Sequence, residues 1–348
     1  MIKQGLSTLR GIARRLKQRY RSAPLILLYH RVSDLRPDPQ LLSVTSEHFG
    51  QQLQILRQST TPMKLQDMVR AMRNNQLPRR SVAVTFDDGY ADNLYNAKPL
   101  LERYGVPGTV YVSSGYVGSG REFYPDVLER IFLQPGSLPE ELHLTVNGKT
   151  HRWHLGNATH YGVDACRANA AWHVLDPENP TPRHHIYRAL CQLLYALPEC
   201  NRRFALDALT SWACRQSICR ETHRVLRAEE VCLLARDGLV EVGSHTVDHP
   251  VLSAIPVADQ RKELQESKRR LEEILDHPVT SFAYPYGTRS DYSAETVELV
   301  REAGYDHACS NFQGHVQPGV DPWQLPRFVV RDWDGDEFAA WIREWRDL

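Results

Sequence analysis

Five short aliphatic runs limit the fold of this 348-residue chain more than any other feature of its sequence. The segments between them, such as 257–275, place leucine and isoleucine on one helical stripe. Strands that alternate with amphipathic helices indicate βα units, and therefore a parallel sheet or barrel in an α/β fold. The five predicted strands lie at residues 24–30, 81–89, 108–114, 239–245 and 280–287.

This alternation stops after about Gly118 and resumes near Val225. The sequence between them is polar and has helical patterns at 187–197 and 203–212. The Asn-Gly pair within residues 141–155 is typical of a hairpin turn. A plain βα loop is only a few residues long, so we interpret this region as a mainly helical inserted subdomain. The expected organisation is an N-terminal segment at 1–23, a barrel formed by 24–118 and 225–348, and an insert at 119–224.

The N-terminal segment is basic and lacks the uninterrupted apolar core of a signal peptide. Its apolar residues recur at helical spacing opposite the basic ones. A helix packed on the barrel and a helix that lies weakly on a membrane surface both remain open. No run in the sequence approaches the roughly 18 apolar residues of a spanning helix. We expect a cytoplasmic protein, with residues 1–23 at the inner face of a membrane as the alternative.

Composition adds constraints on partners and compartment. Basic and acidic residues number 42 each, so no global field favours nucleic acid, and partners must be argued from a local site. The seven cysteines are an odd number without the spacing of a disulfide framework. Free thiols in a reducing compartment are the favoured interpretation, and a structural zinc site near Cys214 and Cys219 is the alternative. Nothing in the sequence indicates an oligomeric state.

The motif TFDDGY, at residues 85–90, follows a predicted strand. In parallel α/β folds the carboxyl ends of the strands form the site. Two adjacent carboxylates there repel each other and lose hydration unless they share a cation. Of Asp87 and Asp88, one can therefore bind a metal while its neighbour serves as a base. A simple turn at Asp88-Gly89 is the alternative.

The motif SHTVDHP, at residues 244–250, follows another predicted strand. His245 and His249 are four residues apart, a spacing that places both imidazoles on one face of a helical turn. Two neutral ring nitrogens and one carboxylate form a facial ligand set with open positions, suited to zinc or a similar divalent ion. The histidine pair alone is weak evidence for a metal site in a chain with 15 histidines. Its position after a strand is what strengthens the prediction.

A third motif, FAYPYG at residues 282–287, places a proline between Tyr284 and Tyr286 at another strand end. The proline stiffens the loop. Such a loop can direct a backbone N–H toward a developing oxyanion and can offer an aromatic wall to a sugar ring. Core aromatic residues beside a turn are the alternative.

Together, TFDDG, SHTxxHP and YPYG resemble the motifs of the polysaccharide deacetylases (carbohydrate esterase family 4), which include chitin, peptidoglycan and poly-N-acetylglucosamine deacetylases. The resemblance covers roughly residues 24–118 and 225–345 and leaves the insert and the N-terminal segment unexplained. It implies a distorted (β/α) barrel with about seven strands. It also implies one catalytic divalent ion, for which we expect zinc, and an N-acetylated glycan as the substrate.

The resemblance also implies roles for individual residues. The family's general acid is usually a late histidine, but none follows Trp333 here. LLYHRV, at residues 27–32, resembles the opening of the permuted branch, in which the acid histidine comes first in the sequence. His30 is therefore the candidate acid, and a core histidine is the alternative. The other implied roles are Asp87 as general base, Asp88, His245 and His249 as metal ligands, and the Tyr286 backbone amide as the group that steadies the oxyanion.

The chain departs from the family in the third motif. Many members carry an arginine there that holds the catalytic aspartate, whereas this chain has Ala283. We expect Arg327, in LPRFVVRDWD, to supply the guanidinium from another strand, and Asp332 to orient His30. Arg331 and Asp334 are close enough in the sequence to compete for these two roles.

These motifs predict a metal-dependent hydrolase that removes N-acetyl groups from the amino sugars of a polysaccharide or glycan. One alternative is a hydrolase of another N-acyl or C–N bond on the same scaffold, acting on a lipid-linked sugar or a small amide. A second alternative is a non-catalytic glycan-binding relative, against which the intact aspartate and histidine motifs argue. The sequence leaves open the glycan, the native ion and the role of the insert.

Overall fold

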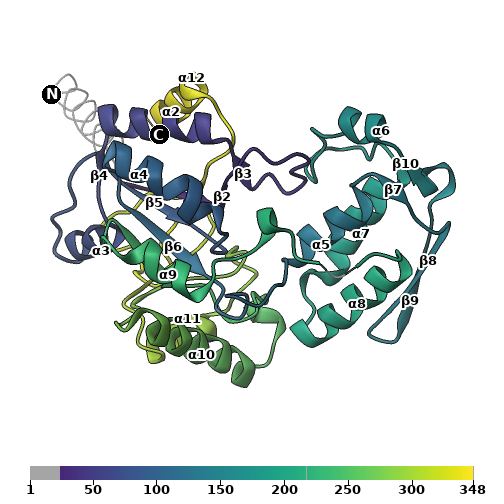
Figure 1. Ribbon diagram of the computed structural model, residues 1–348. Helices are drawn as coiled ribbons and strands as arrows, with labels where there is room; N and C mark the ends of the chain where they lie inside the picture. Colours follow the sequence, from purple (N-terminus) through teal and green to yellow (C-terminus); the bar gives the residue numbers. More distant parts are fainter. Residues whose placement is uncertain (1–23, 217, 348) are drawn as a thin grey trace, which may run out of the picture.

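The structure, a computed structural model, describes residues 24–216 and 218–347. The interpretations of residues 1–23 as a packed surface helix or a membrane contact lie outside the described residues. Figure 1 shows two lobes, a barrel lobe and a smaller lobe formed by the middle of the chain. No helix in the described part of the chain is both long enough and apolar enough to cross a bilayer.

In the described residues, seven parallel strands form the barrel lobe, in the order β13-β12-β11-β6-β5-β1-β14. A parallel bridge between Cys309 and Leu325 links β13 to the segment that leads into β14, so the sheet curls into a distorted barrel. This confirms the predicted fold class. The strands are β1 (Leu25–Tyr29), β5 (Ser81–Phe86), β6 (Gly108–Val112), β11 (Val240–Ser244), β12 (Ser281–Ala283), β13 (His307–Cys309) and β14 (Phe328–Val329). A short strand, β4 (Thr61–Pro62), pairs with β5. Two more short strands, β2 (Arg31–Val32) and β3 (Ser43–Val44), follow β1 in the chain and pair with each other.

Each of the five predicted strands contains an observed one, and every residue of β1, β5 and β6 is buried. These strands read as continuous apolar runs because helices cover the outside of the barrel while side chains fill its inside. Two further strands, β13 and β14, were not predicted; they have three and two residues.

Helices cover the outer face of the sheet (Figure 1). The longest, α10, spans the predicted residues 257–275. The helical segment before β6 begins as a π-helical turn, Asn93–Ala97, because Pro99 has no N–H to continue a regular α-helical pattern. The barrel helices are α2 (Ser46–Ser59), α3 (Leu65–Arg73), α4 (Lys98–Tyr104), α9 (Ala228–Ala235), α10 (Val257–Leu275), α11 (Ala294–Glu302) and α12 (Gly335–Asp347), with short 3-10 turns at Glu221–His223 and Leu252–Ala254.

The smaller lobe, here called the insert, has its own cluster of buried apolar residues, drawn from positions 124–213. Its predicted hairpin is confirmed, with Asn147 and Gly148 both in the left-handed conformation that such a turn needs. The division of the chain at 118/119 and 224/225 remains our proposal. The elements of the insert are α5 (Tyr124–Phe132), β7 (Gly136–Ser137), β8 (Glu141–Val146), β9 (Lys149–His154), a 3-10 turn (Gly156–Thr159), β10 (His160–Tyr161), α6 (Val163–Ala168), α7 (Pro182–Tyr195) and α8 (Glu199–Trp212).

A fully buried arginine holds part of this insert together. Arg183, at the start of α7, has no exposed surface. Its guanidinium donates to the carbonyl oxygens of Ala158, Gly136 and Thr159, at 2.7, 2.8 and 2.8 Å. Burial, with help from Arg215, lowers its pKa to about 10. These bonds join α7 to β7 and to the 3-10 turn at Gly156–Thr159, on either side of the hairpin.

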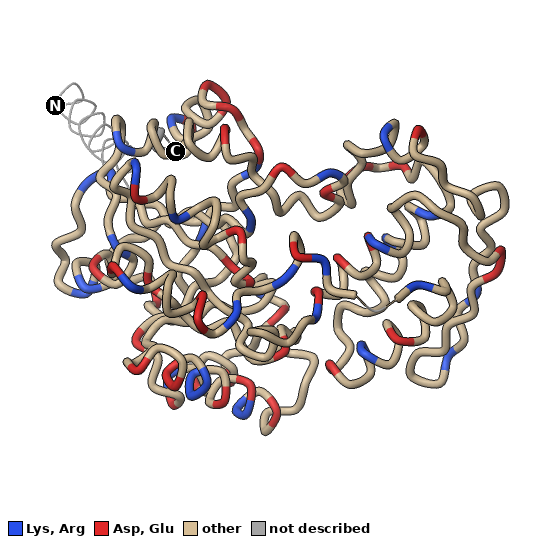
Figure 2. Tube along the Cα trace, viewed as in Figure 1, with Lys and Arg blue, Asp and Glu red and all other residues tan. Residues whose placement is uncertain are grey.

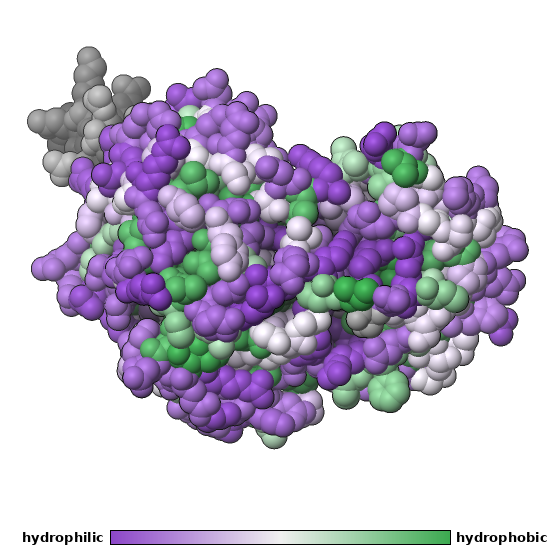
Figure 3. All heavy atoms as spheres, in the orientation of Figure 1, coloured by the Kyte–Doolittle hydropathy of each residue, from purple (hydrophilic) through white to green (hydrophobic). Residues whose placement is uncertain are grey.

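Charged residues are dispersed over both lobes. Figure 2 shows basic and acidic positions interspersed along the trace, most densely on α10. The visible face in Figure 3 is mostly hydrophilic, interrupted by apolar patches. All seven cysteines are free, so no disulfide joins the lobes.

Candidate active site

The two adjacent aspartates follow β5 at the carboxyl end of the barrel. Asp88 adopts a positive φ of 74° and Gly89 one of 77°, so the chain turns sharply away from the strand. A Cβ atom at Gly89 would lie 3.0 Å from the Val112 side chain. This turn ends the alternation of the strand and lets both aspartates reach the same opening, which they line together.

The histidine loop after β11 differs from its prediction. No helical turn forms at residues 245–249; instead Thr246 and His249 take left-handed φ values of 65° and 53°. Glu263 of α10 stabilises this loop by accepting hydrogen bonds from the backbone N–H groups of Val247 and Asp248, at 2.8 and 3.0 Å. The two imidazoles still converge, with ring centroids 4.9 Å apart.

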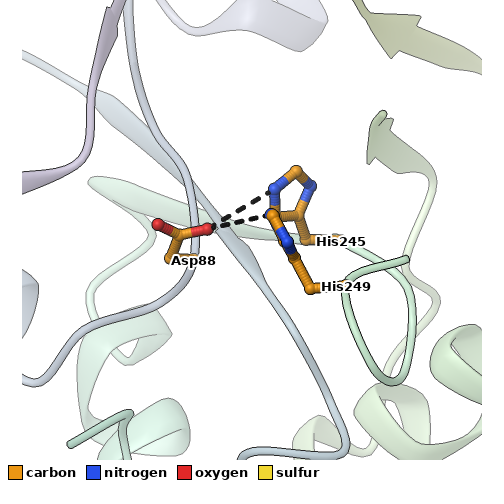
Figure 4. A group of neighbouring side chains, drawn as sticks. All are labelled: Asp88, His245 and His249. Carbon is orange, nitrogen blue, oxygen red and sulfur yellow. Dashed lines mark ion pairs between the residues drawn. The ribbon is translucent and has the colours of Figure 1, made fainter. Parts of the chain in front are cut away.

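Asp88, His245 and His249 bring three ligand atoms within 4.8 Å of one another (Figure 4). The Asp88 Oδ1 atom lies 3.7 Å from His245 Nε2 and 3.3 Å from His249 Nε2. The Nδ1 atom of His245 lies 2.8 Å from the carbonyl oxygen of Ala283, an arrangement that leaves Nε2 free to bind a metal. Burial lowers the pKa of His245 to about 4, so its ring is neutral near pH 7. One carboxylate oxygen and two imidazole nitrogens fit a zinc-like divalent ion.

Arg327 holds Asp87 through two parallel hydrogen bonds. Its Nη1 and Nη2 atoms each lie 2.7 Å from a carboxylate oxygen of Asp87. Burial raises the pKa of Asp87, but the Arg327 guanidinium outweighs this effect and the pKa ends below its ordinary value. The structure thus places a guanidinium from the segment before β14 on the catalytic-base candidate, where the sequence led us to expect it. Such a bidentate pair fixes the orientation of the carboxylate.

His30 follows β1 and lines the same opening as the two aspartates. Its ring nitrogens make no hydrogen bond to any residue in the described part of the chain. Burial lowers its pKa, and the negative charges of Asp88 and Asp87 oppose that shift. An imidazole that faces an opening without a protein partner is available to a ligand.

Tyr286 lies between the histidines and the insert. Its ring centroid is 4.7 Å from that of His249 and 4.5 Å from that of Tyr195 in α7. Its φ of 58° turns the backbone at the end of the third motif. Among the described residues its backbone N–H has no acceptor, so the amide is free to donate to a ligand. Tyr284, by contrast, is a core residue whose hydroxyl donates to the carbonyl of Trp323.

The expectation that Asp332 orients His30 is corrected by the structure. Its Oδ1 atom accepts from the backbone N–H of Thr45 at 2.8 Å and lies 2.8 Å from His48 Nδ1. Asp332 therefore supports the start of α2, outside the opening. Arg331 lines the opening and donates to the carbonyl of Leu41, away from Asp87. Asp334 accepts from the N–H of Glu337 at the start of α12.

One cleft of about 580 Å³ between the lobes is lined by His30, Asp87, Asp88, His245, His249 and Tyr286. That volume lies within the range of small-molecule sites, about 300–1,000 Å³. The insert supplies a second wall that the sequence analysis did not predict, formed by Tyr124, Val174, Leu175 and Tyr195. The only sequence signal for this wall is weak, an apolar Val-Leu pair in a polar stretch. Leu175 is 68% exposed.

The fold and site define a hydrolase-type barrel with a cation-binding donor set at its mouth. A profile of the family described as polysaccharide deacetylase matches residues 74–138 and 197–308, about half of the chain. The chain belongs to the polysaccharide deacetylase family. The stretch between the two matched ranges, 139–196, falls within the insert, so this family profile does not describe most of the second wall of the cleft.

Individual relatives agree with this assignment. The poly-beta-1,6-N-acetyl-D-glucosamine N-deacetylase of Staphylococcus epidermidis is 29% identical over 345 residues, covering 95% of this chain and 86% of that protein. Among solved structures, the deacetylase PplD of Streptococcus pyogenes, in complex with acetate, has a TM-score of 0.57 at 17% identity and covers 92% of this chain and 98% of that one. IcaB from Ammonifex degensii has a TM-score of 0.57 at 19% identity, with coverages of 92% and 97%. These structures share the fold.

Proposed function

We propose that this protein is a metal-dependent N-deacetylase that hydrolyses the N-acetyl group of an amino sugar in a glycan. One observation carries the proposal: Asp88, His245 and His249 converge within 4.8 Å beside Asp87, which Arg327 holds at the wall of an open cleft. The names of the relatives support the substrate class, and zinc is the ion that suits the donor set.

Asp88, His245 and His249 would hold the ion. A bound divalent ion would supply Lewis-acid polarisation of the acetyl carbonyl and would lower the pKa of a water molecule. Asp87 accepts the proton of the attacking water, and its bond to Arg327 keeps it ionised and correctly aimed. A positioned base of this kind contributes roughly 10²–10⁴-fold to a rate.

The remaining groups act on the tetrahedral intermediate and the leaving amine. The free backbone N–H of Tyr286 donates to the oxygen on which negative charge develops. His30, on the barrel side of the cleft, gives a proton to the amine nitrogen as the C–N bond breaks. Without this proton the amine would be too basic to leave. The products are acetate and an amino sugar.

Location and partners extend the proposal beyond the site. We propose an N-acetylated glycan as the partner and the cytoplasm, with residues 1–23 at the inner membrane surface, as the location. A sedimentation assay with vesicles, comparing the full chain with a chain that begins at residue 24, tests the membrane contact. Equal recovery of both chains with the vesicles would contradict it.

The proposal is tested by measuring acetate release from chito-oligosaccharides together with bound metal. The zinc-loaded protein should release acetate, and removal of the ion with a chelator should abolish the release, with recovery on re-addition. Asp87→Asn should keep one ion per chain and lose turnover. Loss of the ion from Asp87→Asn would show that the two aspartates have exchanged roles. Undiminished activity without any bound metal would refute the proposal.

A further inference from the structure

The insert is attached to the barrel around its mouth by hydrogen bonds, ring contacts and the chain itself, and a strand end with such a contact is here called fastened. The positions of these contacts limit what can enter the cleft. At the β1 side, the loop between β2 and β3 reaches the insert. There the N–H of Val174 donates to the carbonyl of Pro39 at 2.9 Å, and Gln40 Nε2 donates to the Tyr187 hydroxyl at 2.8 Å. Both Gln40 and Val174 line the cleft, so this contact closes one of its sides.

The next two strands of the barrel sheet, β5 and β6, also end at contacts with the insert. After β5, the Tyr90 hydroxyl donates to Asp126 Oδ2 of α5 at 2.7 Å. After β6, the chain itself passes into the insert, and Phe123 at that crossing lies against His249, with ring centroids 5.5 Å apart. Tyr90 and Phe123 also line the cleft.

The next two strand ends are joined to the insert by helices α8 and α7. After β11, Arg202 of α8 donates to the carbonyl of His249 at 3.4 Å. After β12, the hydroxyl of Tyr195, the last residue of α7, donates to Asp291 Oδ1 at 2.5 Å, and its ring packs on Tyr286. The insert is therefore fastened at five consecutive strand ends, those of β1, β5, β6, β11 and β12.

The ends of β13 and β14 are different. Within residues 24–216 and 218–347, no hydrogen bond, ion pair or ring contact joins the insert to the segments that follow these two strands. Asn311, Val329 and Arg331 line the cleft on that side. The two strands lie next to each other where the barrel closes, so the strand ends without such a contact are adjacent.

We propose that the cleft is a single-entrance pocket that accepts a terminal or free N-acetylated sugar and excludes the internal residues of a polymer. An internal sugar has neighbours on both sides, so its chain would need an entrance and an exit across the barrel mouth. The fastened insert blocks the exit. This inference rests on the proposed deacetylase function and assigns the insert the role of selecting chain ends.

Position-resolved deacetylation tests the inference. N-Acetylglucosamine and its oligomers of two to six sugars, in both β-1,4 and β-1,6 linkage and labelled at the reducing end, are incubated with the zinc-loaded full chain. Fragmentation mass spectrometry then locates each lost acetyl group. We expect loss only at one terminal sugar and equal initial rates per chain for the trimer and the hexamer. Loss of several acetyl groups, including internal ones, would overturn the single-entrance pocket and leave the deacetylase function standing. No acetate from any substrate, the monosaccharide included, would refute the proposed function itself.

A second test weakens the contacts between the insert and the barrel. Tyr195→Phe removes the hydrogen bond to Asp291, and combined with Gln40→Ala it releases the insert on two sides. The double variant should raise the hexamer-to-monosaccharide rate ratio by about fivefold or more, the factor that corresponds to one net hydrogen bond. Tyr161→Phe is the matched control, because the Tyr161 hydroxyl donates to the carbonyl of Ala165 within the insert, and its ratio should equal that of the wild type. An unchanged ratio in a folded double variant would mean that these contacts do not restrict entry.

Discussion

The barrel and the insert each contain an arginine with no exposed surface, and the two are used in opposite ways. Arg327 of the barrel faces a carboxylate, Asp87, which raises its pKa despite the opposing effect of burial. Arg183 of the insert donates to carbonyl oxygens and lies 5.4 Å from the centroid of the Tyr161 ring, and burial lowers its pKa. The first guanidinium positions the proposed general base, whereas the second joins segments of backbone. Chemistry is thus concentrated in the barrel, and the insert contributes shape.

The largest difference between the barrel and the insert is expected when one histidine is removed from each lobe. His249→Ala removes one of the three proposed metal ligands, so it should abolish the bound ion and the acetate release, with a loss of metal affinity above the ~100-fold typical of an outer-sphere change. His185→Ala, at an exposed position on α7, is the control and should retain both. Metal analysis and acetate assays on the two variants make the measurement. Comparable losses in both would place part of the chemistry in the insert.

The next largest effect is expected at His30. His30→Ala should reduce amide hydrolysis by roughly 10²–10⁴-fold, the contribution of a general acid, and leave the ion bound. Hydrolysis of an activated ester should fall far less, because its leaving group needs no proton. His48→Ala is the matched control, since His48 pairs with Asp332 outside the cleft. If both substrates lose rate equally, His30 is not the acid.

Arg327→Met should destabilise the protein by about 3–5 kcal/mol, because it leaves Asp87 buried without a partner. The kcat of the folded fraction should also fall, since the base loses its orientation. Adding Asp87→Asn removes the unpaired charge, so the double variant should be more stable than Arg327→Met alone. Denaturant unfolding of the three proteins measures these differences. A double variant no more stable than the single one would show that the ion pair is not the source of the loss.

The smallest effect is expected at the other arginine. Arg183→Met leaves carbonyl groups in the insert without their donor and should cost about 1–3 kcal/mol in the free energy of unfolding. Its kcat, per folded molecule, should equal the wild-type value. Thermal unfolding and acetate assays run side by side test this. A fall in kcat as large as that of Arg327→Met would erase the distinction between the two buried arginines.

The barrel and most of its site could be predicted from the sequence because strand ends carry local signals. Asp87 and Asp88 follow a buried run within one motif, and His245 and His249 do the same. The shape of the histidine loop could not be predicted, since it depends on Glu263, 16 residues beyond Val247, which accepts two backbone hydrogen bonds. The insert wall at Tyr195 and Val174 was also missed. It arises from contacts between distant segments that leave no periodic pattern in the sequence.

The short length of some strands explains the other features that could not be predicted from the sequence. β14 has two residues, too few for any alternation to be visible, and yet the segment that leads into it carries Arg327. Asp332 was assigned to His30 on proximity in sequence to this segment, whereas the chain turns after Val330 and directs that carboxylate to Thr45 and His48.

The position of Arg327 links chain completion to the readiness of the site. Residues 325–329 close the barrel, because they pair with both β13 and β1. Until they dock, Asp87 lacks its counter-ion and favours the protonated, inactive form. A nascent or truncated chain that ends before residue 327 would therefore present the proposed metal ligands without a competent base. On the proposed mechanism, hydrolysis would begin only once the barrel has closed.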